Sequence, residues 1–120
     1  MMMEIPICAV IFKGMLAERE IPSFRGAIMG IAGNNPLFHN HSDKGDIYRY
    51  PRIQYKVINR HPAVIGLAEG ADSLCKLFLL GAKHVMKIGR ECREFVVDDV
   101  NKESFVFPLK RLLYSSAAAL

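Results

Sequence analysis

The sequence lacks the short motifs that mark the commonest nucleotide-, cofactor- and zinc-dependent enzymes. It has no phosphate-binding loop, dinucleotide-binding glycine fingerprint, nucleophile elbow or His-Glu-x-x-His segment. Its three cysteines, Cys8, Cys75 and Cys92, are too far apart to suggest a disulfide framework or a zinc site. These absences argue against nucleotide hydrolysis, dinucleotide redox chemistry and zinc proteolysis. We expect Cys8 and Cys75, which lie in apolar stretches, to be reduced core residues.

The sequence also lacks an apolar run long enough to cross a membrane. The longest such run, residues 5–12, contains Pro6 and is shorter than the about 20 residues that a spanning helix needs. The first residues lack the basic region and cleavage site of a signal peptide, so we expect a cytoplasmic location. A chain of 120 residues, with 51% hydrophobic and 23% charged residues, fits one folded domain. Its net charge of +4 is compatible with a polyanionic partner.

The first part of the chain predicts a strand followed by a helix. Residues 4–13 are apolar at odd and even positions, which is typical of a strand at the centre of a sheet or covered on both faces. Pro22 suits a helix start, and the Gly-Asn-Asn-Pro segment at 33–36 ends the helix. Gly26 and Gly30 weaken the helix by about 1 kcal/mol each relative to alanine, so we interpret them as room for a close neighbour. Helical spacing links the apolar residues Phe24, Ala27, Ile28 and Ile31.

The second part predicts a hairpin, a second helix and further strands. Residues 52–58 alternate with a period of two, and a turn at 59–62 leads into a returning strand at 63–67. After Glu69-Gly70, the apolar stripe of a helix consists of Ala71, Leu74, Cys75, Phe78 and Leu79, and Gly81 is a stop signal. Two short strands at 84–88 and 92–97 flank a Gly89-Arg90 turn, and residues 104–107 are a candidate for one more.

The order of these elements predicts the fold class. Strand, helix, strand, strand, helix and strand form the ferredoxin-like β-α-β-β-α-β arrangement. This is an α+β fold with an antiparallel sheet and two helices on one face. We expect residues 1–120 to form a single domain of this kind.

The densest group of chemically useful side chains lies in and around the segment that connects the first predicted helix to the second predicted strand. Metal-free RNA cleavage needs a base for the 2′-hydroxyl, an acid for the leaving 5′-oxygen and a cation for the phosphorane. Histidine suits the proton transfers and basic residues suit the charge, while tyrosine can orient the phosphate or stack on a base. The candidate catalytic residues are therefore His39, His41 and Tyr48. The candidate RNA-binding residues are Arg25, Arg49, Arg52, Gln54 and Lys56.

The same connection permits a metal-binding interpretation. A divalent cation could use His39, His41, Asp43 and Asp46, because imidazole and carboxylate are good ligands. We prefer the interpretation in which the two acids form a turn, and we expect no metal and no cofactor. The adjacent letters His39-Asn40-His41 are not an HNH nuclease motif, whose residues are separated along its fold. His61 and His84 lie in a hairpin turn and a strand, and we assign them no function.

Several segments together resemble one known family. They are Arg25-Gly26-Ala27, His39-Asn40-His41, Tyr50-Pro51-Arg52-Ile53-Gln54-Tyr55-Lys56 and Glu69-Gly70, and they are specific only in combination. The family is that of the CRISPR-associated endoribonucleases that process the repeat transcript, in the subtype with a His-x-His active site.

The resemblance implies a ferredoxin-like RAMP domain of the RRM type. It also implies metal-independent cleavage of CRISPR repeat RNA that leaves a 2′,3′-cyclic phosphate. The family's catalytic histidines fall on His39 and His41, and its assisting tyrosine falls on Tyr48. Its basic residues on the strand after the loop match Arg52 and Lys56.

Members of this family usually carry two tandem ferredoxin-like domains and a glycine-rich loop near the C-terminus. This sequence accounts for one domain and contains no such loop, so we expect it to correspond to the N-terminal half. Its expected partners are repeat RNA and either a second copy of the chain or a second ferredoxin-like domain, with no membrane. Two alternatives remain: a non-catalytic RNA-binding or assembly subunit, and a truncated inactive remnant.

Overall fold

The computed structural model describes residues 2–33, 35–39, 41–42, 45–46, 52–79 and 83–108. Its main feature is a five-stranded antiparallel sheet in the order β4-β5-β1-β7-β6. The sheet strands are β1 (Met2–Lys13), β4 (Ile53–Ile58), β5 (His61–Leu67), β6 (Lys83–Ile88) and β7 (Glu91–Pro108). The helical segments are η1 (Glu18–Glu20), α1 (Ile21–Ala32), α2 (Pro36–His39) and α3 (Glu69–Phe78). The strands β2 (His41–Ser42) and β3 (Gly45–Asp46) form a separate small hairpin.

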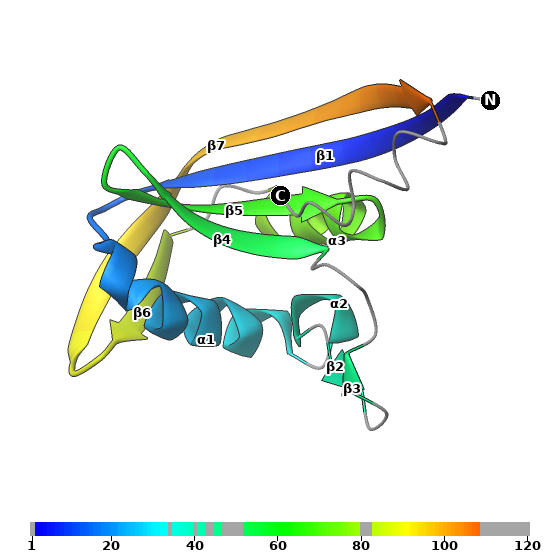
Figure 1. The fold of residues 1–120 in the computed structure, drawn as a ribbon. Coiled ribbons are helices and arrows are strands. Elements are labelled where there is room, and N and C mark those ends of the chain that lie inside the picture. Colours follow the sequence, from blue (N-terminus) through cyan, green and yellow to red (C-terminus); the bar gives the residue numbers. More distant parts are fainter. Residues whose placement is uncertain are drawn as a thin grey trace.

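The predicted ferredoxin-like fold is confirmed. Elements β1, α1, β4, β5, α3 and β7 follow the expected order, and β6 adds an edge strand. The helices α1 and α3 lie beneath the sheet in Figure 1, on the same side. The central strand β1 pairs with β5 on one side and with β7 on the other. Of the two interpretations of the apolar first strand, the central position in a sheet is therefore correct.

The prediction of separate strands at 92–97 and 104–107 is wrong, because both belong to the single strand β7. The first part of β7 pairs with β6, and the rest pairs with β1 (Figure 1). A register shift opposite Ile11 and Phe12 leaves Asp98 without a partner, which is a β-bulge. The polar residues between the two predicted strands resemble a loop in sequence. Pairing with β1 holds them in a strand, because tertiary context overrides weak β-propensity.

The core lies between the sheet and the two helices, and phenylalanine rings connect its parts. Phe12 of β1 makes edge-to-face contacts with Phe24 of α1 at 5.8 Å and with Phe78 of α3 at 5.3 Å between ring centroids. All three rings are buried. The predicted stripes of both helices face this core, except that Leu79 is 64% exposed and lies beyond the end of α3. Gly81 lies outside the described residues.

The cysteines are free, as expected. Cys8 is buried, Cys75 packs against the core, and Cys92 is exposed. Burial and the neighbouring Cys75 thiol raise the pKa of Cys8 to about 11. The structure thus brings together two thiols that are distant in sequence, and both belong to the packed interior rather than to a reactive site.

Our interpretation of Gly26 and Gly30 is wrong. A Cβ atom built at either position would meet no atom within 4 Å. The close approach occurs instead where β5 meets the start of α3. A Cβ on Gly66 would lie 2.5 Å from the carbonyl oxygen of Gly70, and a Cβ on Gly70 would lie 2.5 Å from that of Arg52. Glycine at 66 and 70 therefore allows α3 to pack directly on the sheet.

This difference predicts opposite effects of one substitution at two glycines. Gly30→Ala should raise the free energy of unfolding by up to about 1 kcal/mol, because it removes backbone entropy from an open helix surface. Gly70→Ala should lower it by about 1–3 kcal/mol, because the new methyl group meets backbone atoms. Urea unfolding followed by circular dichroism would measure both values. Destabilisation by Gly30→Ala would show that this helix surface is occupied.

Candidate functional site

The segment that follows α1 is more ordered than the sequence pattern predicts. We expected a polar connection over residues 37–50, but its described part contains the end of α2 and the hairpin of β2 and β3. The side-chain oxygen of Asn35 accepts a hydrogen bond of 3.0 Å from the backbone N–H of Leu37. Phe38 is buried in the main core, so the chain is anchored to the core at the residue directly before His39.

The two candidate histidines occupy different kinds of backbone. His39 is the last residue of α2, and His41 is the first residue of β2. The backbone is therefore helical at His39 and extended at His41. The register of the small hairpin places His41 opposite Asp46. Asp43, Tyr48 and Arg49 lie outside the described residues.

The structure divides the remaining candidate RNA-binding residues into two groups. In β4, the core side consists of Ile53, Tyr55 and Val57, as predicted. Alternation along a strand places Arg52, Gln54 and Lys56 on the opposite, outer face. Arg25 is exposed on α1, on the helix side of the sheet. The edge strand β4 thus separates Arg25 from the other three.

Arg25 lies near Tyr55, a residue that the sequence analysis did not single out. Burial raises the pKa of the Tyr55 phenol to about 12, and the nearby charge of Arg25 partly opposes this shift. The Tyr55 hydroxyl is buried, and it has no hydrogen-bond partner in the described part of the chain. Its ring packs edge-to-face on Phe24, with 6.2 Å between ring centroids. Tyr55 is therefore a neutral core residue rather than a proton donor near neutral pH.

Arg52 connects β4 to the start of α3. Its Nε donates a hydrogen bond of 3.0 Å to Glu69 Oε2, and its carbonyl oxygen accepts one of 2.8 Å from Leu67 N–H. The backbone N–H of Glu69, together with Arg52, holds the pKa of that carboxyl below its usual range. The Glu69-Gly70 pair identified in the sequence thus has structural roles, one in an ion pair and one in close packing.

Comparison with known proteins identifies the family. A family profile described as "Cas6b N-terminal domain" matches residues 3–105, a range that includes most of β1, His39, His41 and most of β7. The chain belongs to the Cas6b N-terminal domain family. The chain is also similar to a crystal structure of Cas6b, with a TM-score of 0.65 and 22% sequence identity.

The solved Cas6b is about twice as long as this chain. The match covers 88% of this chain and 48% of the solved chain. No curated protein sequence matches the chain. The structural likeness supports the fold, and the profile supports the family.

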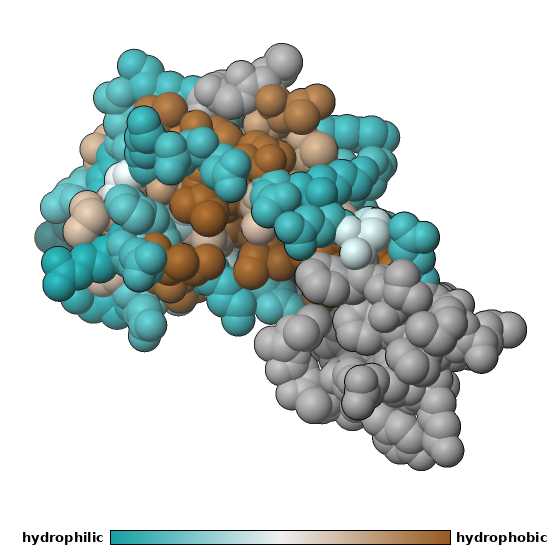
Figure 2. All heavy atoms as spheres, turned by 90° about the horizontal axis from the view of Figure 1, so that it is seen from above, coloured by the Kyte–Doolittle hydropathy of each residue, from teal (hydrophilic) through white to brown (hydrophobic). Residues whose placement is uncertain are grey.

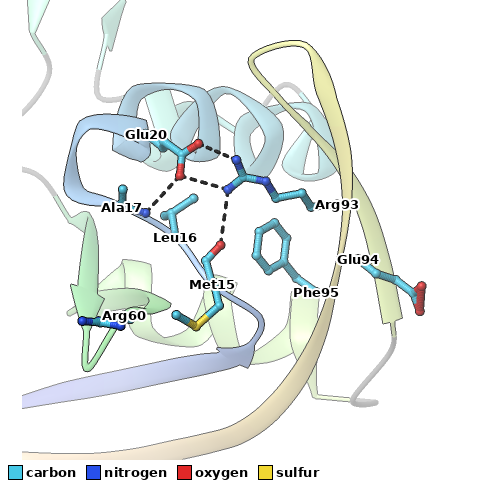
Figure 3. Close-up of a pocket in the computed structure, with 8 residues that line it drawn as sticks. All are labelled: Met15, Leu16, Ala17, Glu20, Arg60, Arg93, Glu94 and Phe95. Atoms are coloured by element: carbon cyan, nitrogen blue, oxygen red, sulfur yellow. Dashed lines mark hydrogen bonds and ion pairs between the residues drawn. The ribbon is translucent and has the colours of Figure 1, made fainter.

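A second feature lies near the beginning of α1, away from the histidines. A cavity of about 530 Å³ is lined by Met15, Leu16, Ala17, Glu20, Arg60, Arg93, Glu94 and Phe95 (Figure 3). At its edge, the Arg93 guanidinium donates hydrogen bonds of 2.9 and 2.6 Å to the two carboxylate oxygens of Glu20. Figure 3 shows Arg93 also reaching the carbonyl oxygen of Met15. Glu20 and Arg93 are 73 positions apart in the sequence, so no local sequence pattern could reveal their ion pair.

The described part of the chain contains no group of three or more His, Cys, Asp or Glu residues that could hold a metal ion. Among the same residues, no helix is long and apolar enough to cross a membrane. The described residues therefore include no set of metal ligands. The ion pair of Glu20 with Arg93 links η1 to β7.

The ion pair predicts a specific dependence of stability on pH. Hydrogen bonds from Arg93, and one from the Ala17 backbone N–H, lower the pKa of Glu20 from 4.5 to about 2. A carboxyl group with a lower pKa in the folded state stabilises the fold above its unfolded pKa, and this contribution is lost as pH falls. Glu20→Gln should therefore lower Tm relative to the parent above pH 4.5, and the difference should vanish as pH approaches about 2.

Glu18→Gln is the matched control, because Glu18 is exposed in the same short helical segment. Thermal unfolding of the three proteins across this pH range would measure the effect. Equal Tm values for the parent and Glu20→Gln at neutral pH would contradict a stabilising role for the pair.

Proposed function

We propose that this chain is a CRISPR repeat-RNA-processing endoribonuclease or the N-terminal half of one. Membership of the Cas6b N-terminal domain family, over residues 3–105, is the observation that supports this function. The matched range includes the His39-Asn40-His41 segment, and the burial of Phe38 fixes one end of that segment to the core. Residues 1–120 would then be one ferredoxin-like RAMP domain.

In the proposed reaction, the 2′-hydroxyl of the RNA attacks the adjacent phosphorus. A new O2′–P bond forms, and the P–O5′ bond breaks. One of His39 and His41 accepts the proton of the 2′-hydroxyl, and the other donates a proton to the leaving 5′-oxygen. Tyr48 orients the phosphate by hydrogen bonding. The products are a 2′,3′-cyclic phosphate and a 5′-hydroxyl, and no metal or cofactor takes part.

The proposed RNA contacts are made by two groups of residues. Arg25 lies on α1, which precedes the histidine segment, and Arg49 follows that segment in the sequence. Arg52 directly precedes β4, and Gln54 and Lys56 lie on its outer face. This strand is the first strand of the main sheet after the histidine segment. Because β4 is an edge strand, an RNA backbone could reach both groups by passing along that edge.

We also propose that the chain acts together with a second ferredoxin-like unit. The solved Cas6b to which it is similar is about twice as long, and the match covers 48% of it. The second unit would be another copy of the chain or a separate domain. This length difference also favours a second candidate function, that of an RNA-binding or assembly half without turnover.

The histidines provide the direct test of catalysis. With repeat RNA as substrate in the presence of EDTA, His39→Ala or His41→Ala should lower the cleavage rate by about 10²–10⁴-fold. The rate of the parent should depend on pH near neutrality, because imidazole changes its protonation during turnover. End-group analysis of the product should detect the cyclic phosphate.

His61→Ala is the matched control for a histidine outside the site. Its Nδ1 lies 2.7 Å from the Gly14 carbonyl oxygen, so a small loss of Tm is expected without loss of rate per folded molecule. A metal-dependent site would instead lose activity in EDTA and would depend on Asp43 and Asp46. If the variant lacking both His39 and His41 imidazoles cleaved as fast as the parent, this segment would not be the active site. RNA binding without product would favour the assembly function.

Lys56 provides a separate test of RNA binding. Lys56→Ala should weaken RNA binding and reduce the slope of log affinity against log salt concentration by about 1, because one phosphate contact is lost. Fluorescence anisotropy at several salt concentrations would measure both values. Lys76→Ala is the control, since Lys76 is an exposed lysine on α3 that pairs with Asp72. An unchanged salt slope for Lys56→Ala would remove Lys56 from the RNA-binding residues.

A further inference from the structure

A groove of about 530 Å³ lies between α1 and the edge strand β6. One wall is the surface of α1 around Gly26 and Gly30, and the other wall is β6 from Val85 to Lys87. Figure 2 views the molecule from above Figure 1 and shows apolar side chains gathered in the middle of that upper surface. Because α1 lies beneath the sheet (Figure 1), the groove belongs to a different surface.

The helix wall of the groove is low because it contains two glycines. Gly26 and Gly30 are about one helical turn apart and exposed, and a Cβ atom built on either would meet no atom within 4 Å. Each glycine costs the helix about 1 kcal/mol relative to alanine, and no contact within the described part of the chain requires it. A neighbour from outside the chain that approaches the helix backbone closely would require both.

The strand wall presents backbone groups that do not pair with β7. The turn after β6 has two residues and begins with Gly89, whose φ of 65° fits a type II′ turn. A turn of this kind is flanked by a hydrogen-bonded pair, here Ile88 and Glu91, and the pairing alternates along the strands. The N–H and C=O groups of Val85 and Lys87 therefore point away from β7, and no described strand pairs with that side of β6.

An extended peptide fits between these two walls. Its backbone can pair with the outward N–H and C=O groups of an edge strand, and its alternate side chains then enter the groove beside that strand. The groove is apolar at Ala27, Ile31 and Met86, so it suits apolar peptide side chains. RNA fits less well, because the described lining of the groove contains no aromatic side chain on which a base could stack.

The charges along β6 indicate an acidic peptide. Lys87 and Arg90 are exposed at one end of the strand, and neither forms an ion pair within the described part of the chain. At the other end, Lys83 already pairs with Glu94. Val85, between the two ends, is 68% exposed. Because cross-strand neighbours on one face interact, we expect Asp or Glu opposite Lys87 and a β-branched residue opposite Val85.

We propose that the groove between α1 and β6 binds an extended acidic segment of a partner protein, which adds to β6 as a new edge strand. Apolar side chains of the segment enter the groove above Gly26 and Gly30, and its acidic side chains lie beside Lys87 and Arg90. This docking site goes beyond the proposed function and does not depend on it, because it involves neither RNA nor the histidine segment.

Selection from a library of short random peptides displayed on phage tests the proposal. The parent chain should enrich sequences in which apolar residues alternate with Asp or Glu. A fluorescent synthetic peptide of the most enriched sequence is the probe, and fluorescence anisotropy measures its affinity. Lys87→Glu should weaken binding by roughly tenfold, because it opposes like charges. Lys13→Glu is the matched control, since Lys13 is exposed on β1 outside the groove, and it should bind as the parent does.

Substitutions in each wall test how the peptide is held. Val85→Pro removes an N–H that points away from β7, so it should abolish peptide binding while β6 stays paired. Val85→Thr keeps this N–H and should bind the peptide. Gly30→Leu should lower the affinity by roughly tenfold or more, because its side chain fills the groove, whereas Gly30→Ala adds only a methyl group and should lower it less. Circular dichroism and Tm would confirm that the variants fold.

Amide hydrogen exchange tests the strand geometry in the parent chain itself. Without peptide, the N–H groups of Val85 and Lys87 should exchange faster than those of His84 and Met86, which pair with β7. Bound peptide should slow exchange at Val85 and Lys87. If Val85→Pro does not fold, this measurement and the Gly30→Leu affinity decide the proposal.

No enrichment of peptides by the parent would overturn the proposal. So would a selected peptide that binds Gly30→Leu as tightly as the parent, or one that leaves exchange at Val85 and Lys87 unchanged. Repeat RNA whose binding is lost in Gly30→Leu would assign the groove to RNA, and a parent dimer lost in the same variant would assign it to a second copy. Either result would overturn the proposal. Failure of RNA cleavage would count against the proposed function alone, because the peptide measurements use no RNA.

Discussion

The packing of Phe12 between the two helices is the contact on which the rest of the structure depends. Its ring contacts Phe24 of α1 and Phe78 of α3 edge-to-face, and both of those rings are buried. Because Phe12 belongs to the central strand, this contact fixes each helix relative to the whole sheet. It also positions α1, the helix that precedes the histidine segment. The position of the candidate site is thus a consequence of core packing.

The sequence predicted the parts of this arrangement that depend on residues close together in the chain, and it failed for parts that depend on distant residues. The spacing of Phe24, Ala27, Ile28 and Ile31 predicted the buried face of α1 correctly, because helix periodicity is a local property. The single strand β7 was not predicted, because its polar middle is held by pairing with β1. The two glycines on α1 were misinterpreted for a related reason. A sequence shows where a side chain is missing, and only the fold shows whether anything fills the space.

The same limit applies to the candidate site. Motif resemblance drew attention to His39 and His41, but it did not predict that one ends a short helix and the other begins a short strand. Arg25 lies apart from Arg52, Gln54 and Lys56 because α1 lies beneath the sheet. The spacing of these residues in the sequence does not show this. The pairing of Glu20 with Arg93 depends on contacts between distant parts of the chain. Local patterns therefore predicted single helices and strands better than contacts between distant residues.

The two faces of β1 explain why this small domain suggests a partner. Cys8, Val10 and Phe12 face the helices and are buried, whereas Ile7, Ala9 and Ile11 face away and are half-buried. A sheet with helices on one side needs only one apolar face, and its other face is usually polar. Here polar and charged residues lie toward the margins of the outer face, with Gln54 and Lys56 on β4 and Asp99, Asn101 and Glu103 on β7. Apolar residues in the middle and opposite charges at the margins are what an interface needs to exclude water and fix its orientation.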